Sequence, residues 1–153
     1  MSTIFSRKCE YALQAVLYLA LKPRGELTSM KELAKQLELP FHFVSKILQS
    51  LTHEGLLSSL KGPSGGFALA VPPEEMTLLR IVEAIDGTGF ASSCVLGFSE
   101  CTDKAPCALH STWAQVRDGP FTLLLRKSVA ELARETKKPR FPQDGRAPSI
   151  QTK

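Results

Sequence analysis

Three cysteines and one histidine in the second half of the chain are spaced as the ligands of a metal centre could be. They are Cys94, Cys101, Cys107 and His110. Thiolates bind soft metals and iron-sulfur clusters well. Structural zinc sites usually present their cysteines as close pairs, which this spacing lacks. The pattern alone leaves open an iron-sulfur cluster, a zinc site, and a thiol switch or inert cysteines.

The segment that carries these cysteines is expected to be a long loop, because residues 88–106 show neither a helical nor a strand period. Loops of this length inside a compact domain are usually functional, and a metal site would explain what holds this one in place. Cys9, the fourth cysteine, is expected to be a half-buried small residue. So few, unevenly placed cysteines indicate a reducing, cytoplasmic location.

The first third of the chain predicts three helices, because its apolar residues recur at three- and four-residue spacing. The expected helices cover residues 11–22, 29–37 and 40–54. Pro23 ends the first helix and Gly55 ends the third. Ser29, with Glu32 three positions later, has the pattern of a capping box that begins the second helix.

Two short apolar runs, residues 56–60 and 67–71, flank the glycine-rich segment Lys61–Gly66 and predict a hairpin. Three helices followed by such a hairpin predict a winged helix-turn-helix, a mainly α fold with a small β-hairpin wing. The third helix would then read DNA in the major groove, while the wing reaches phosphates or the minor groove. The expected DNA contacts are His42, Phe43, Ser45, Lys46 and Gln49 of the helix and Lys61, Ser64, Gly65 and Gly66 of the wing. A winged helix used for protein contacts is the alternative.

Beyond the wing, Thr77 is expected to cap a fourth helix that ends at Gly87. A long C-terminal helix is expected from residue 108 to residue 133, kinked or interrupted at Gly119 and Pro120. Its surplus of apolar surface is typical of a dimerisation helix, and folding back on its own domain is the alternative. The predicted organisation is a DNA-binding domain (1–72), a cluster loop with dimerisation helices (73–136) and a disordered basic tail (137–153).

Charge is unevenly distributed along the chain. The three predicted segments carry formal charges of +3, −3 and +4, within a net charge of +4. An acidic middle argues against a uniformly basic packaging protein. No apolar run is long enough to span a membrane, and no catalytic nucleophile and base, substrate pocket or small-molecule site is evident, so an enzyme is not expected.

From Phe5 to about Ala133, the sequence resembles the Rrf-two family of winged-helix regulators, which includes the iron-sulfur regulator IscR and the nitric-oxide sensor NsrR. The segments that carry the resemblance are Ser6–Arg7–Lys8, Tyr11–Ala12–Leu13, Leu56–Ser59, Lys61–Phe67, Ile81–Gly87, and Cys107 to His110 with Trp113. The resemblance implies a homodimer on a roughly palindromic double-stranded DNA operator. It also implies a 2Fe-2S or 4Fe-4S cluster on Cys94, Cys101 and Cys107.

The resemblance offers two fourth ligands. His110, after Cys107, corresponds to the histidine of IscR-like 2Fe-2S sites and is favoured, with 2Fe-2S as the favoured cluster. Glu10 corresponds to a position from which other members supply a carboxylate across the dimer. This chain departs from IscR in a six-residue gap between its first two cysteines and in Pro120 within the dimerisation helix.

These features predict a transcription regulator, with repression favoured, that senses redox state, iron or nitric oxide through an iron-sulfur cluster. A cluster-free thiol or zinc switch is the alternative within regulation. A small iron-sulfur electron carrier is the alternative from another class, but it would leave the helix-turn-helix at residues 28–71 without a purpose.

Overall fold

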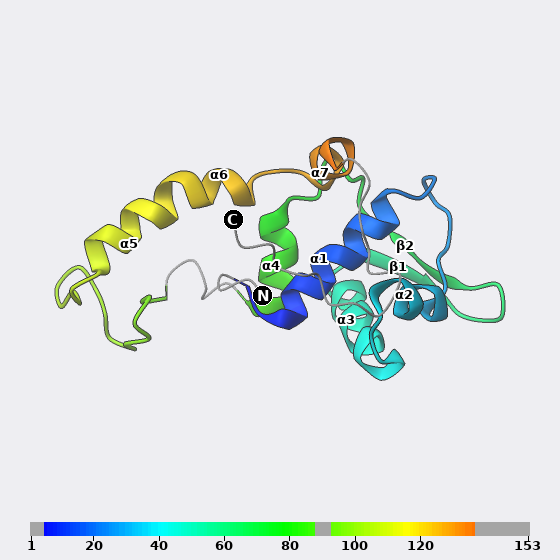
Figure 1. The fold of residues 1–153 in the computed structure, drawn as a ribbon, viewed down its shortest axis with the longest axis horizontal. Helices are drawn as coiled ribbons and strands as arrows, with labels where there is room; N and C mark the ends of the chain where they lie inside the picture. The colour runs from blue at the N-terminus through cyan, green and yellow to red at the C-terminus, as the bar shows by residue number, and fades with distance from the viewer. Residues whose placement is uncertain (1–4, 88–92, 137–153) are drawn as a thin grey trace, which may run out of the picture.

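The computed structural model describes residues 5–87 and 93–136. Its elements are α1 (Arg7–Ala20), α2 (Met30–Leu37), α3 (Phe41–His53), β1 (Leu57–Leu60), β2 (Gly66–Leu69), α4 (Leu78–Asp86), α5 (His110–Val116), η2 (Arg117–Phe121), α6 (Thr122–Leu125) and α7 (Val129–Glu135). Helices α1 to α4, the hairpin and α7 form a body, and α5, η2 and α6 form an arm that projects from it (Figure 1). The expected tail and part of the expected loop, residues 88–92, lie outside the described residues.

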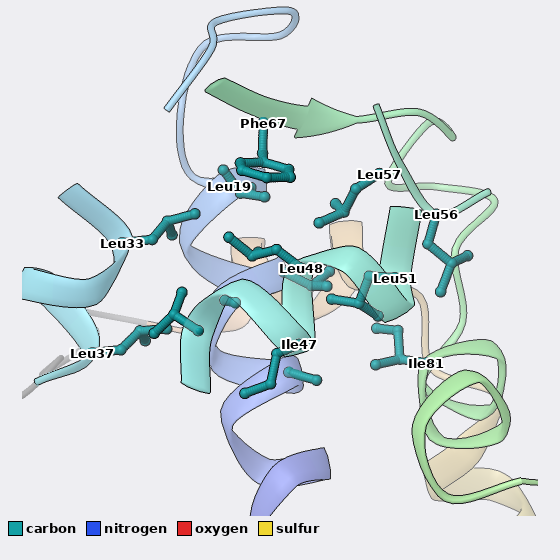
Figure 2. Close-up of a cluster of buried hydrophobic side chains, with 14 of the residues drawn as sticks. Leu19, Leu33, Leu37, Ile47, Leu48, Leu51, Leu56, Leu57, Phe67 and Ile81 are labelled. Atoms are coloured by element: carbon teal, nitrogen blue, oxygen red, sulfur yellow. The ribbon is translucent and has the colours of Figure 1, made fainter. Parts of the chain in front are cut away.

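The body is held together by one apolar core to which every helix of the helix-turn-helix contributes. Leu33 of α2 and Ile47, Leu48 and Leu51 of α3 are at most 1% exposed, and they pack around α1 (Figure 2). Burying a side chain of this size stabilises the fold by about 1.5–3 kcal/mol. The predicted winged helix-turn-helix, mainly helical with a two-stranded hairpin, is therefore confirmed.

Helix α1 begins four residues earlier than the sequence predicts. The Ser6 side chain accepts a hydrogen bond from the Cys9 backbone N–H and caps the helix at Arg7. At α2, Ser29 caps the helix as predicted by accepting from the Glu32 N–H. The Glu32 carboxylate, expected to complete a capping box, instead accepts bonds from Tyr18 Oη at 2.6 Å and Lys22 Nζ at 2.7 Å. It thereby ties α2 to α1.

The wing is a two-stranded antiparallel hairpin in which Leu57 pairs with Leu69 and Leu60 pairs with Gly66. Thr28, just before α2, extends it through a bridge to Phe67, with N–O distances of 2.9 and 2.8 Å. Gly66 is required at this junction, because a Cβ there would lie 2.5 Å from the Thr28 carbonyl oxygen. The wing is thus anchored directly to the start of α2.

The C-terminal part of the chain differs from the single long helix expected over residues 108–133. Helix α5 passes through the π-helical turn η2, where Gly119 leaves helical geometry beside Pro120, into α6, which ends at Leu125. A new helix, α7, starts at Val129 with a complete capping box between Ser128 and Glu131. The expected interruption at Gly119 and Pro120 is present, but the helix also breaks after Leu125, and the chain turns back onto the body.

Two contacts fix α7 on the body. Ser128 forms a bridge with Thr77, the residue that caps α4, and the Val129 N–H donates to the Met76 carbonyl at 2.7 Å. Val129 itself is 1% exposed within the main core. The fold-back that the sequence left as an alternative therefore applies to α7, while α5 and α6 form the arm (Figure 1).

The arm is rooted in a second apolar cluster. Phe121 and Leu125 pack with Leu78 and Val82 of α4 and with Cys9 of α1. Within the described residues, no helix combines the length and apolar character that a membrane span requires.

Candidate metal centre and nucleic-acid interface

The structure brings together the three cysteines that the sequence singled out. The Sγ atoms of Cys94, Cys101 and Cys107 all lie within 4.8 Å of one another, and those of Cys94 and Cys107 are 3.6 Å apart. Each side chain is half-buried, and all three thiols are free. The loop before α5 holds them at the outer end of the arm (Figure 1).

His110, the first residue of α5, stands beside this thiol group. Its Nδ1 lies 3.1 Å from the Cys101 Sγ, and its Nε2 lies 2.9 Å from the Asp103 Oδ1. The Cys107 N–H also points at the Cys101 sulfur, at 3.4 Å. The imidazole is therefore held between a thiol on one edge and a carboxylate on the other. The sequence predicted His110 but not Asp103, whose signal is only its place between Cys101 and Cys107.

The environment makes the three thiols unequal. Partial desolvation raises the pKa of Cys94, but hydrogen bonds from the Phe98 and Leu96 backbones and from the neighbouring thiols outweigh it and lower that pKa to about 7. At Cys101 the Cys107 backbone N–H lowers the pKa, while desolvation and the thiols of Cys107 and Cys94 raise it more, so the net shift is upward. A cluster of thiols that starts to ionise near neutral pH suits metal binding, because the thiolate is the ligand.

The arm itself holds the loop in place. The Trp113 indole N–H donates to the Ser93 carbonyl at 3.1 Å, and its ring packs 6.4 Å from that of Phe121. Trp113 thus joins the loop to the arm. Arg117, at the π-helical turn, lines the same small pocket as the three cysteines. It is paired with Asp118 through two hydrogen bonds.

The donor set fits the iron-sulfur cluster that the family resemblance implies. Three thiols converge with an imidazole nitrogen beside one of them, and both ligand types occur on the irons of biological clusters. The same set is also compatible with zinc, because zinc accepts thiolate and imidazole ligands.

Glu10, the alternative fourth ligand, lies in the first turn of α1. The described residues place only the three cysteines in the ligand group, so the group includes neither Glu10 of the same chain nor His110, which lies beside Cys101. Helix α1 lies in the body, whereas the cysteine loop lies at the outer end of the arm (Figure 1). Glu10 could therefore act only on a partner's loop, as the resemblance implied.

Helix α3 presents a mixed polar surface. His42, Lys46 and Gln49 are exposed, and Gln49 Nε2 donates to the half-buried Ser45 Oγ at 3.2 Å. Phe43, another expected DNA contact, is half-buried and packs edge-on against Tyr11 with ring centroids 5.8 Å apart. Phe41, which the sequence did not single out, is 57% exposed at the start of the helix.

A further lysine reaches this helix from α1. The Lys8 Nζ lies 3.4 Å from the Ser50 Oγ, and that hydroxyl in turn donates to the Lys46 carbonyl. The sequence offered only the match of Lys8 to a family segment, because its proximity to α3 depends on how the two helices cross.

The four wing residues that were expected to contact DNA differ from one another in exposure. Lys61 and Ser64 are exposed, whereas Gly66 is buried in β2. The Gly65 N–H donates to the Gly62 carbonyl at 3.0 Å within the turn. A Cβ at Gly65 would lie 1.9 Å from the Leu60 carbonyl oxygen. The two glycines therefore permit the tight wing, and Lys61 and Ser64 are its outward groups.

Between α3 and the wing lies a cleft of about 620 Å³. Its lining includes Gln49, Thr52 and His53 of α3, Ser59 and Lys61 of the wing, and Ser29 before α2. Four of the expected DNA contacts, Gln49, Lys61, Gly65 and Gly66, thus line a common depression.

This chain is a member of the Rrf2 family of transcription regulators. Residues 5–135 match that family, which is described as an iron-dependent transcriptional regulator. The fold and the family define a winged helix-turn-helix regulator of transcription that binds DNA and is not an enzyme. This class agrees with the prediction from the sequence.

The chain is similar in sequence to two family relatives and in structure to one solved protein. An HTH-type transcriptional regulator of Aquifex aeolicus is 33% identical over 91% of this chain and 97% of its own length. The regulator IscR of Aliivibrio salmonicida is 25% identical over 82% of this chain and 74% of its own. The structure of CymR, the global cysteine regulator of B. subtilis, superposes with a TM-score of 0.72 at 27% identity, covering 90% of this chain and all of that one.

Proposed function

We propose that this regulator binds an iron-sulfur cluster through Cys94, Cys101 and Cys107 and that the state of the cluster sets its affinity for an operator. The observation that carries the proposal is the convergence of the three sulfurs within 4.8 Å, with His110 Nδ1 at 3.1 Å from one of them. The similarity to IscR, which spans most of the chain, supports it. When bound, the cluster supplies a group that responds to redox state, iron supply or nitric oxide.

His110 is the fourth ligand that we favour, and a 2Fe-2S cluster is the type that we favour, with 4Fe-4S as the alternative. The support is positional: His110 already contacts Cys101, whereas Glu10 lies in the body of its own chain. A carboxylate from the partner subunit remains the competing fourth ligand.

We propose that the active form is a homodimer joined through the arm. Apolar side chains stay exposed along it, with Val116 46%, Leu123 69% and Leu124 40% exposed. Exposed apolar surface of this kind marks an interaction site. Two copies paired through α5 and α6 would present two α3 helices to a roughly palindromic site in double-stranded DNA.

The DNA contacts that we propose follow the exposed surface. Gln49 and Ser45 suit base edges, while Lys46, Lys61 and Ser64 suit phosphates. His42 is exposed near the start of α3 and suits a base edge or a phosphate. Gly65 and Gly66 shape the wing and bring its backbone close to DNA, and Phe43 supports α3 through Tyr11.

Coupling between the two sites follows from the arm. We propose that holding or releasing the three thiols changes the conformation of the cysteine loop at residues 93–109, and that the arm sets the spacing of the two DNA-reading bodies. We propose repression of transcription in the cytoplasm as the outcome, with release of DNA when the ligands are freed or altered.

The test is the visible absorbance and the iron and sulfide content of protein purified without oxygen. We expect a coloured protein that contains iron and sulfide, loss of the absorbance in Cys101→Ala, and no loss in Cys9→Ala, whose thiol lies in the body. Colourless protein that cannot be reconstituted would refute the cluster. Unchanged absorbance in Cys101→Ala would remove that residue from the ligands.

A second function has one observation in its favour. The Cys94 and Cys107 sulfurs are 3.6 Å apart, a short movement from a disulfide. In a cluster-free thiol switch, hydrogen peroxide would accept two electrons and two protons from these thiols and leave as two waters. Metal analysis separates the candidates: iron with sulfide supports the cluster, zinc supports a zinc switch, and metal-free protein with a peroxide-dependent Cys94–Cys107 disulfide supports the thiol switch.

A further inference from the structure

Asp103 stands on the side of His110 that faces away from the thiols. Its Oδ1 is 2.9 Å from His110 Nε2, and its side chain is 99% exposed, whereas that of His110 is 25% exposed. The opposite ring nitrogen, Nδ1, is 3.1 Å from the Cys101 sulfur. The carboxylate and the thiol therefore act on the two nitrogens of one ring.

A carboxylate accepts hydrogen bonds and does not donate them when ionised, so the N–H of a neutral imidazole placed this way lies on Nε2. The other nitrogen, Nδ1, then carries the free lone pair and points toward the cysteines. Histidine ligands of metals commonly donate their second ring N–H to a carboxylate or carbonyl, which fixes the orientation of the ring.

We propose that Asp103 is a positioning residue that presents Nδ1 of His110, and not Nε2, to the metal centre beside Cys101. This inference rests on the proposed function. Asp103 lies outside the ligand set, and the ligating atom is Nδ1 of His110. Because Asp103 lies between Cys101 and Cys107, the loop that carries two of the thiols also orients the imidazole.

The placement of Asp103 supports this role. The Cys107 N–H and His110 Nδ1 both approach the Cys101 sulfur, so a rotation of the His110 ring would break the contacts of both of its nitrogens. Thr102 and Ala105, on either side of Asp103, are joined by a bridge in which the Ala105 N–H donates to the Thr102 carbonyl at 3.1 Å. The Thr102–Ala105 bridge therefore closes the turn that carries Asp103.

The test uses full-length, cluster-loaded protein labelled with histidine that carries ¹⁵N only at Nδ1 or only at Nε2. The chain has three histidines, and His42 and His53 lie on α3 in the body, so His110 is the one that can ligate. In electron–nuclear double resonance of the reduced protein, we expect strong coupling from the Nδ1 label. Strong coupling from the Nε2 label, or from neither label, would overturn the proposal.

Two variants measure what Asp103 contributes. Removing such an outer partner typically costs 10- to 100-fold in metal affinity, and we expect about the lower end of that range here, as cluster loss to a chelator about ten times faster in Asp103→Ala. Asp103→Asn keeps an oxygen acceptor and should recover part of the loss. Glu100→Ala is the matched control, because it removes an exposed carboxylate from the same loop. Equal rates in Asp103→Ala and Glu100→Ala would contradict the role of Asp103.

The positioning role of Asp103 can be tested even if the protein binds no cluster. If the wild-type protein takes up no iron, the proposed function fails, and the ¹⁵N chemical shifts of His110 in the metal-free protein then decide the inference. A preference for the N–H on Nε2 that is lost in Asp103→Ala supports the positioning role, and no difference between the two proteins overturns it.

Discussion

Ser6 and Asp86 join the start of α1 to the end of α4. The Ser6 backbone N–H donates to the Asp86 Oδ2 at 3.1 Å, and the Ser6 hydroxyl donates to the other carboxylate oxygen while accepting from the Cys9 N–H. Asp86 is the last residue of α4, directly before the segment that leads to the cysteines. This contact secures the end of α4 from which that segment departs.

Replacing either partner should weaken this junction. We expect Ser6→Ala to lower the free energy of unfolding by about 1 kcal/mol, the typical value of an N-cap. Asp86→Ala should cost a similar amount, and the double variant should cost less than the sum, because both changes remove the hydrogen bond between the Ser6 hydroxyl and the Asp86 carboxylate. Urea denaturation measures all three. Strict additivity would show that the two residues do not act together.

The buried thiol of Cys9 gives a prediction about pH. Burial, followed by the nearby Asp86 carboxylate, raises the pKa of Cys9 from its ordinary value of 9.0 to about 12. Between these values the unfolded chain loses the proton while the folded chain retains it, so stability falls as the pH rises from about 9 to 12. We expect this alkaline loss, measured by urea denaturation, to be shallower in Cys9→Ala. Parallel pH profiles for the two proteins would contradict the raised pKa.

The sequence predicts correctly the features that depend on short-range contacts, such as helix caps and buried helix faces. Ser29 and Thr77 cap their helices as predicted, and the three- and four-residue spacing of apolar residues predicted α3, whose buried side chains are Val44, Ile47, Leu48 and Leu51. These features depend on residues within one or two turns of each other, which is why periodicity and capping patterns detect them.

The prediction of a single C-terminal helix was wrong, because a continuous apolar period masked the local signal for a new helix. Ser128 and Glu131 form a capping box that marks a new helix, yet the apolar period runs on through Val129 and suggested one continuous helix. The Asp103–His110 contact and the approach of Lys8 to α3 depend on how a loop or two helices meet in space, and no spacing rule encodes them. The cysteines were identified by type and spacing, but their convergence depends on the loop.

The exposed arm predicts the behaviour of the dimer. Leu123 is 69% exposed, so Leu123→Glu should leave the fold of the monomer unchanged while placing a charge in the proposed interface. We expect analytical ultracentrifugation to show a shift from dimer to monomer with unchanged circular dichroism. Leu60→Glu, the same substitution at a leucine that is 59% exposed on the wing, is the matched control. A fully dimeric Leu123→Glu protein would show that the interface lies elsewhere.

The surface of α3 predicts two kinds of effect on DNA binding. Lys46→Ala should weaken binding to all sequences alike and reduce the salt dependence by about one counterion, as loss of a phosphate contact does. Gln49→Ala should instead relax the preference at one base position, at a cost of about 1–3 kcal/mol. Fluorescence anisotropy over a salt series checks both. Lys104→Ala, exposed in the cysteine loop, should behave as the wild type.

The central claim is that a metal centre on Cys94, Cys101 and Cys107 controls DNA affinity through the arm. It is tested most directly by measuring, without oxygen, the affinity of one protein preparation for an inverted-repeat DNA site selected for binding to this protein, before and after the iron is removed. We predict a change of at least about ten-fold, which corresponds to about 1.4 kcal/mol, in the wild type and none in Cys101→Ala. An iron-loaded wild type whose affinity is unchanged by iron removal would contradict the claim.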